Sequence, residues 1–219
     1  SIAADASGSI IVAGYGHNLV SASSGNDWWI KKYNSGGDEL NFGGDDTGPC
    51  GTGASPCTTN TLDMALDVNE LQDRATAVAV DSANNVYVAG YVTTDSMTAI
   101  GTYWHVKKFS DTGVKDMKGW DKLLFYGYGM PCAVKTDAYD NVYLVGNGSN
   151  LITITSGSDW IIKKFNAQGH EDVYRWRKFY NFNGKDTAMA IAIGTYEVYV
   201  AGYGGVSGNG DDVCIKKFY

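Results

Sequence analysis

The chain has 219 residues, 44% of them hydrophobic, and a formal net charge of −7. This hydrophobic content is enough for a packed core, so intrinsic disorder is excluded, and the negative charge argues against a nucleic-acid partner. No stretch of about 18 apolar residues is present, so no membrane span is expected. Glycine, tyrosine and tryptophan are frequent (28, 15 and 6 residues), which favours short strands joined by glycine-rich turns.

The first elements along the chain set a pattern that returns three times. A strand-like start at 1–5 is followed by IIVAGY (10–15) and WWIKKY (28–33). The first segment returns as VYVAGY, VYLVGN and VYVAGY, and the second as WHVKKF, WIIKKF and VCIKKF. The recurring glycines are separated by 76, 56 and 56 residues: Gly14, Gly90, Gly146 and Gly202. A fixed period of this kind identifies a repeat architecture.

The third copy shows the whole unit most clearly. Strands are expected at 132–137, 142–147, 159–165 and around 174–180, separated by turns rich in Asn, Asp and Gly. Four short antiparallel strands in about 40 to 56 residues are typical of a β-propeller blade. We therefore predict an all-β propeller with four recognisable four-stranded blade repeats, the last one lacking its fourth strand. The blades are expected at about 1–45, 76–127, 132–182 and 188–219.

The unfinished fourth repeat leaves two interpretations. Either the chain is a fragment of a larger ring, or a neighbouring chain supplies a strand, because an uncovered strand edge invites β-pairing.

An insertion is expected at 46–75, between the first two repeats. Cys50 and Cys57 lie seven residues apart there, a spacing that permits a small disulfide loop, with two free thiols as the alternative. Within the insertion, 62–74 shows the only helix-like periodicity of the chain. Cys132 and Cys214 fall in predicted strands, where we expect small buried apolar residues rather than a pair. The cysteine pair favours an oxidising compartment.

The segment D-x-x-x-N-V-Y-V-A-G-Y at 81–91, followed by D-x-x-x-K-K-F as at 159–165, resembles the bacterial seven-bladed SBBP β-propeller repeats. The resemblance covers most of all four copies. It implies the propeller architecture and a secreted or cell-surface location, without naming a ligand. This chain departs from the family pattern in its double lysine, in its cysteine-bearing insertion, and in Gly194, which stands where the turn aspartate is expected.

Recurring polar residues are explained first by folding. Asp5, Asp81 and Asp137 head a tight turn, where a carboxylate can accept hydrogen bonds from the backbone two residues on. A calcium loop is the alternative, but the ligand spacing of an EF-hand is missing, and we predict no metal site. The two lysines of each KK pair should point to opposite faces of the sheet, with their charges met by acids. A repeated anion site is the alternative.

The tryptophans of the third strands are the candidate ligand-binding residues. Trp28, Trp104 and Trp160 occupy equivalent positions, and Val213 replaces them in the fourth copy. They either pack between blades or act as stacking platforms for sugars. The acids just before these positions could bond sugar hydroxyls: Asp27, Asp159 and Asp212.

No catalytic motif is legible in the chain, since the nucleophile elbow, the H-E-x-x-H motif, the P-loop and the C-x-x-C motif are all missing. His17, His105 and His170 fall in unrelated parts of the repeat. We therefore predict no catalytic residues and no cofactor. The favoured function is a secreted or cell-surface, non-enzymatic binding or scaffold module with a protein or glycan partner, including self-association by strand addition. The alternatives are a lectin-like propeller and a hydrolase with a site in a central channel.

Overall fold

The computed structural model describes residues 1–17, 25–40, 42, 72–96, 99–116, 118–205 and 210–219. Within these ranges the chain forms fifteen β-strands and no helix. The strands make four antiparallel sheets, which we call sheets I to IV in chain order. The all-β prediction is confirmed for this part of the chain. The predicted Cys50–Cys57 loop lies outside the described residues. Most of the helix-like stretch at 62–74 also lies outside them, and its last residue, Arg74, is the first residue of a strand.

Each sheet is an up-and-down meander whose strands follow their order in the sequence. Sheet I contains β1 (Ile2–Ala4), β2 (Ile10–His17), β3 (Asn26–Tyr33) and β4 (Glu39–Leu40). Sheet II contains β5 (Arg74–Val80), β6 (Val86–Ser96), β7 (Ala99–Phe109) and β8 (Lys122–Phe125). Sheet III contains β9 (Pro131–Thr136), β10 (Val142–Ser149), β11 (Ser158–Phe165) and β12 (Lys178–Tyr180). Sheet IV has three described strands, β13 (Thr187–Ile193), β14 (Val198–Gly205) and β15 (Asp211–Phe218).

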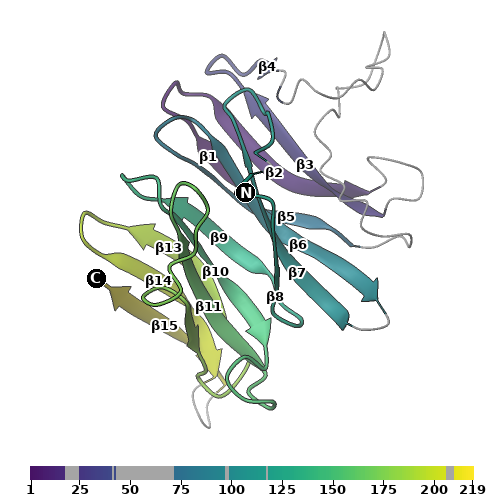
Figure 1. Cartoon of the computed structure of the whole chain (residues 1–219), viewed down its shortest axis with the longest axis vertical. Helices are drawn as coiled ribbons and strands as arrows, with labels where there is room; N and C mark the ends of the chain where they lie inside the picture. The colour runs from purple at the N-terminus through teal and green to yellow at the C-terminus, as the bar shows by residue number, and fades with distance from the viewer. Residues whose placement is uncertain (18–24, 41, 43–71, 97–98, 117, 206–209) are drawn as a thin grey trace.

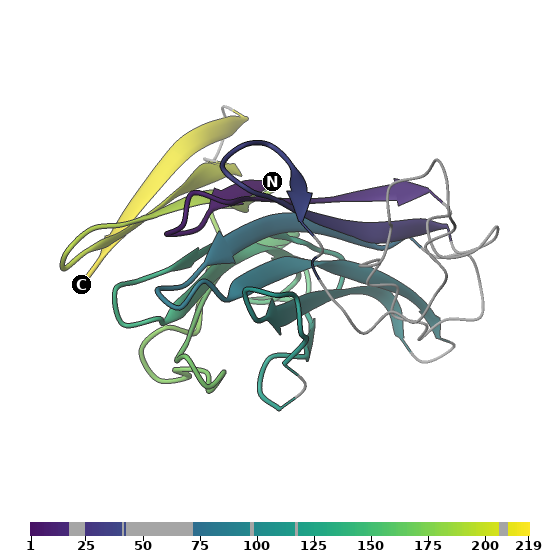
Figure 2. The same ribbon diagram turned by 90° about the horizontal axis from the view of Figure 1, so that it is seen from above.

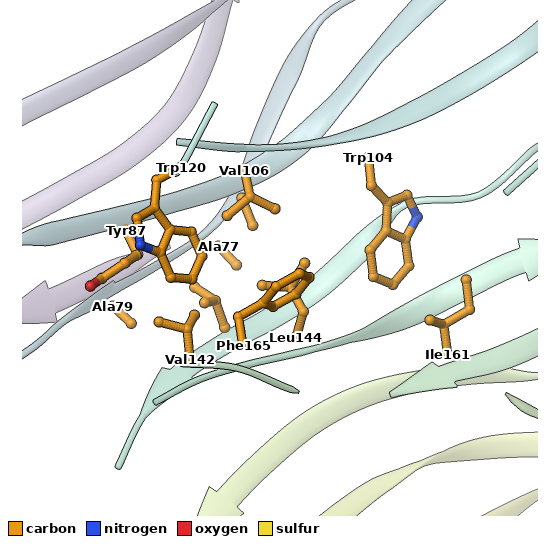
Figure 3. Packing of buried hydrophobic residues seen from close by; sticks show 12 residues of the cluster. Ala77, Ala79, Tyr87, Trp104, Val106, Trp120, Val142, Leu144, Ile161 and Phe165 are labelled. Carbon is orange, nitrogen blue, oxygen red and sulfur yellow. The ribbon is translucent and has the colours of Figure 1, made fainter. Parts of the chain in front are cut away.

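Successive sheets pack face to face along an arc (Figures 1 and 2). One apolar cluster fills each junction: the first joins sheets I and II, the second sheets II and III, and the third sheets III and IV. Figure 3 shows the middle cluster, in which Trp104 and Val106 of sheet II face Leu144 and Ile161 of sheet III. No cluster of the described residues joins sheet IV back to sheet I. The arrangement is consistent with a blade-repeat fold, and no closed ring is formed in this part of the chain.

The turn between the first and second strands is built by its leading aspartate, as predicted. Asp81 Oδ1 accepts hydrogen bonds from the backbone N–H groups of Ala83 and Asn85, and Asp5 and Asp137 do the same in their own sheets. Neighbouring turns are also linked, since the Ser82 backbone N–H and hydroxyl both donate to Asp140 of the next sheet. The turns therefore tie together both their own sheet and the sheet beside it.

The lysine pairs divide between the two faces, as predicted. In sheets I to III the second lysine of each pair meets the turn acid of its own sheet, as in Lys32 with Asp5 at 2.9 Å and Lys108 with Asp81 at 3.7 Å. The first lysine of these three pairs points to the other face and is almost fully buried. Its partner there is an acid from the segment after the third strand: Lys31 with Glu39, Lys107 with Asp121, and Lys163 with Glu171. The lysine pairs of sheets I to III are thus neutralised within their own sheets, which leaves no repeated anion site there.

Candidate functional site

The three tryptophans of the third strands are structural links between sheets. Trp28, Trp104 and Trp160 are fully buried, with 0% of each side chain exposed. Each indole N–H donates to a backbone carbonyl of the next sheet: Trp28 to Tyr91, Trp104 to Asn147 and Trp160 to Tyr203, at 3.4, 3.2 and 2.8 Å. Stacking on a sugar requires an exposed ring face, which none of them has. The packing interpretation is the one that fits their geometry.

The glycine of the second strand makes room for the tryptophan of the preceding sheet. A Cβ placed on Gly90, Gly146 or Gly202 would lie 2.6, 2.7 or 2.9 Å from Cζ2 of that tryptophan, and within 2.2 Å of a backbone carbonyl oxygen. The strand register also shifts beside each of these glycines. The recurring tryptophan and the recurring glycine are therefore two halves of one contact, which crosses from each sheet to the next.

The candidate acids are not brought together in the fold, because they belong to different sheets. Asp27 and Asp159 are fully buried. Asp159 accepts from the Leu151 N–H and the Ser156 hydroxyl, both at 2.6 Å, and so organises the loop that precedes its own strand. Asp212 is exposed on β15. These positions do not form a common ligand site.

The outer face of sheet IV, turned away from sheet III, is uncovered. Val213 and Ile215 on β15 are 83% and 68% exposed, whereas Trp160 and Ile162 at the equivalent positions of sheet III are fully buried. Tyr199 and Tyr203 lie opposite Lys217 and Val213 in the register and are also exposed on this face. Along its other edge, β15 pairs with no described strand. A free strand edge beside an apolar face is therefore the most distinctive surface of the described molecule.

A cleft of about 1350 Å³ lies between sheets III and IV, beside the end of β15. The turn of sheet IV differs here, because Gly202 follows Gly194 by eight residues, whereas Gly146 follows Asp137 by nine. The described residues contain no bond between this shorter turn and Ala138, although Ser82 and Ala6 each bond the next turn along. In the fourth repeat, Gly194 replaces the turn aspartate and the turn is one residue shorter, and no hydrogen bond among the described residues links it to the turn of sheet III.

Aromatic and charged side chains line the cleft. Tyr139, Tyr174 and Tyr196 at its mouth are strongly exposed. Deeper in the cleft, the Lys164 ammonium lies 4.9 Å from the Tyr143 ring centroid and 5.6 Å from that of Trp176. Glu197 replaces the missing turn aspartate as the partner of the second lysine, since its Oε1 lies 3.3 Å from the Lys217 Nζ. Four cations and three acids contribute to the lining: Lys164, Arg175, Lys178 and Lys217, with Asp137, Asp172 and Glu197.

Sheet II contains a buried His–Asp–Lys cluster that no sequence motif indicates. His105 is fully buried against Trp28, and its Nε2 lies 2.6 Å from Asp121 Oδ1. Burial, together with the charge of Lys107, lowers the His105 pKa to about 4, although Asp121 opposes this shift. Lys115 holds the other carboxylate oxygen of Asp121 at 2.9 Å. The imidazole has no exposed surface and packs at the junction between sheets I and II, against Trp28.

His105 and Asp121 are separated by 16 residues, and no local motif links them in the sequence. Cys132 and Cys214 are free thiols and half-buried, as expected of residues that do not pair. No group of three or more His, Cys, Asp or Glu side chains within the described ranges is placed to hold a metal ion. Among these residues there is also no helix long and apolar enough to cross a membrane.

Comparison with protein-family models finds none that matches the chain. A search of curated proteins likewise finds no match.

Proposed function

We propose that the chain is a secreted or cell-surface, non-enzymatic binding module of the β-propeller type, and that it binds its partner through the outer face and free edge of sheet IV. The observation that carries this proposal is the exposure of Val213 and Ile215, at 83% and 68%, where sheets I to III bury the equivalent side chains. The likeness of the repeats to SBBP propeller repeats supports the architecture and the location.

Physical chemistry favours a binding role for this surface. Burying an aliphatic side chain contributes about 1.5–3 kcal/mol, and an added strand also satisfies the backbone groups of the edge. Natural sheets usually protect such edges with charges, bulges or covering segments. On β15, Val213 and Ile215 are exposed beside the charged residues Asp211, Asp212 and Lys217. A second copy of the chain is one partner that can supply the covering strand or face.

Light scattering coupled to size-exclusion chromatography tests self-association through this surface. We expect the apparent mass to rise with protein concentration and Ile215→Lys to return the chain to a monomer. Ile154→Lys is the matched control, because Ile154 is 90% exposed on a loop outside sheet IV. A strict monomer at high concentration, unchanged by Ile215→Lys, would contradict self-association through sheet IV.

The cleft between sheets III and IV favours a second candidate function, lectin-like binding of a glycan. Exposed tyrosines next to carboxylates and ammonium groups can stack on sugar rings and bond their hydroxyls. A glycan array decides this, with Tyr196→Ala as the loss variant and the distant exposed Tyr128→Ala as control. Uniform absence of binding across the array would remove the candidate.

A further inference from the structure

The segment that follows the third strand has the same design in sheets I to III. It begins with a small polar residue, and the residue three positions later is a glycine with a positive φ. The pairs are Asn34 with Gly37 (φ 87°), Ser110 with Gly113 (φ 85°) and Asn166 with Gly169 (φ 82°). The backbone N–H of each of these glycines donates to the carbonyl of the polar residue, which closes the turn. The segment then runs back along the third strand as the fourth strand.

An acid in this segment neutralises the first lysine of the pair. In sheets I and III the acid stands two residues after the glycine, as Glu39 and Glu171, while sheet II uses Asp121. In sheet IV the first lysine of the pair is Lys216. It has no carboxylate partner among the described residues, and its ammonium instead lies 4.3 Å from the ring centroid of Tyr180 and 5.3 Å from that of Phe182. Within the described residues, sheet IV therefore has the cation of this contact without the anion.

The turn of the segment also contacts the preceding sheet. Between sheets II and III, the Trp120 indole N–H donates to the carbonyl of Ala167, which lies in the turn of sheet III, at 2.8 Å. Trp176 occupies the equivalent position at the next junction, at the wall of the cleft, and no acceptor for its indole N–H is found in the described part of the chain. The cleft thus presents a donor where the other junction receives a turn carbonyl.

Resting on the proposed function of sheet IV, we propose the chemistry of its partner: an extended peptide segment of the form polar-x-x-Gly-x-acid, followed by a β-strand. Its turn occupies the cleft and offers a carbonyl to Trp176. Its carboxylate pairs with Lys216, and its strand extends sheet IV along β15. The uncovered cation, the unpaired indole donor and the free strand edge all lie along the path that this segment follows in sheet III.

A synthetic peptide with the sequence of residues 166–180 is the probe, because it is the segment that performs this role in sheet III. Titrated into the whole chain by calorimetry, it should bind. The peptide carrying Glu171→Gln should bind about tenfold more weakly, since the loss of one partner from a desolvated charge pair is costly. Lys216→Met in the chain should cause the same loss, and the two changes together should lose little more.

Two variants control for general damage to the fold. Lys216→Arg keeps the charge and should keep the affinity. Lys135→Met removes an exposed charge on β9, outside the lining of the cleft, and should also leave the affinity unchanged. Equal binding by the native, Glu171→Gln and scrambled peptides would overturn the proposed pattern while leaving sheet IV as a strand acceptor. If no peptide binds and the chain is also a strict monomer, both the pattern and the proposed function fail.

Discussion

The junction between sheets II and III and the outer face of sheet IV show the same face of the repeat, covered by a neighbouring sheet in the first case and exposed in the second. At the junction, Trp104 is fully buried over Gly146, and its N–H is bonded to the next sheet. On the outer face, Val213 stands at the tryptophan position and is 83% exposed. The difference teaches that the strands form within each repeat, whereas burial of their apolar face requires a neighbouring sheet.

Truncation of the junction tryptophan should have the largest effect. Trp104→Ala removes a buried indole and its hydrogen bond, so we expect a loss of about 3–5 kcal/mol in the free energy of unfolding. Val213→Ala, at the equivalent exposed position, should change it by no more than about 0.5 kcal/mol. Urea unfolding of both variants measures the difference. Similar losses in the two variants would mean that the tryptophan does not hold the sheets together.

The paired glycine gives the next largest contrast. In Gly146→Ala the new methyl group would meet the Met130 carbonyl oxygen at 2.2 Å, so strands or sheets must shift, at a cost of about 3 kcal/mol. Gly14→Ala has no atom within 4 Å of the new methyl group and should be neutral or slightly stabilising. Thermal denaturation of the two variants tests this. A destabilised Gly14→Ala would show that a covering group is present over sheet I.

The turn aspartate comes third. Burial raises the pKa of Asp137, but hydrogen bonds from Asn141, Tyr139 and Tyr143 outweigh burial and hold this pKa below its usual value. Asp137→Ala should therefore cost about 2 kcal/mol at neutral pH, and less at strongly acidic pH, where the carboxylate is protonated in the native chain. The reverse change, Gly194→Asp, should give no gain, because the new side chain would approach Glu197. Chemical unfolding of both variants at two pH values measures this.

The last contrast concerns pH. Because the folded chain lowers the His105 pKa from 6.5 to about 4, the unfolded chain takes up the proton first as pH falls. This contribution is complete above pH 6.5 and is lost between 6.5 and 4. His105→Ile, which introduces the residue found at this position in sheet III, should flatten the decline of stability in that window. Lys107, Lys115 and Asp121 face the ring and stay in place in this variant.

His170→Ile serves as the control for pH, because His170 is exposed in a turn. It should retain the decline of stability between pH 6.5 and 4. Equal slopes for wild type and His105→Ile would show that the buried imidazole does not couple to folding.

Much of the fold could be predicted from local signals. The period of the glycines located the repeated strands, and the residue types at the turns predicted the role of Asp81 and its equivalents. Strand alternation predicted that the two lysines of each pair separate to opposite faces. Each of these features depends on residues within one repeat, where sequence distance and spatial distance agree.

The candidate site could be predicted only in part. The residue types identified Trp160 and its equivalents as special but could not say which side of the sheet would be covered. The sequence shows that Gly194 replaces the Asp at the turn of the fourth repeat. The cleft that accompanies this change also involves Trp176, which is far from Gly194 and Lys217 in the sequence. The His105–Asp121 pair was missed because Asp121 lies in the segment before β8, 16 residues after His105, and no local motif links the two.

The sequence by itself determined the repeated unit: strand order, turn chemistry and the separation of charges between the two faces of each sheet. Only the tertiary structure decided that each tryptophan packs on the glycine of the next sheet, and that the Lys216 ammonium lies over the rings of Tyr180 and Phe182. Local backbone preferences and strand alternation act within a few residues, and the sequence therefore records them directly. Burial depends on which sheet stands beside which, and this is settled only when the sheets stack.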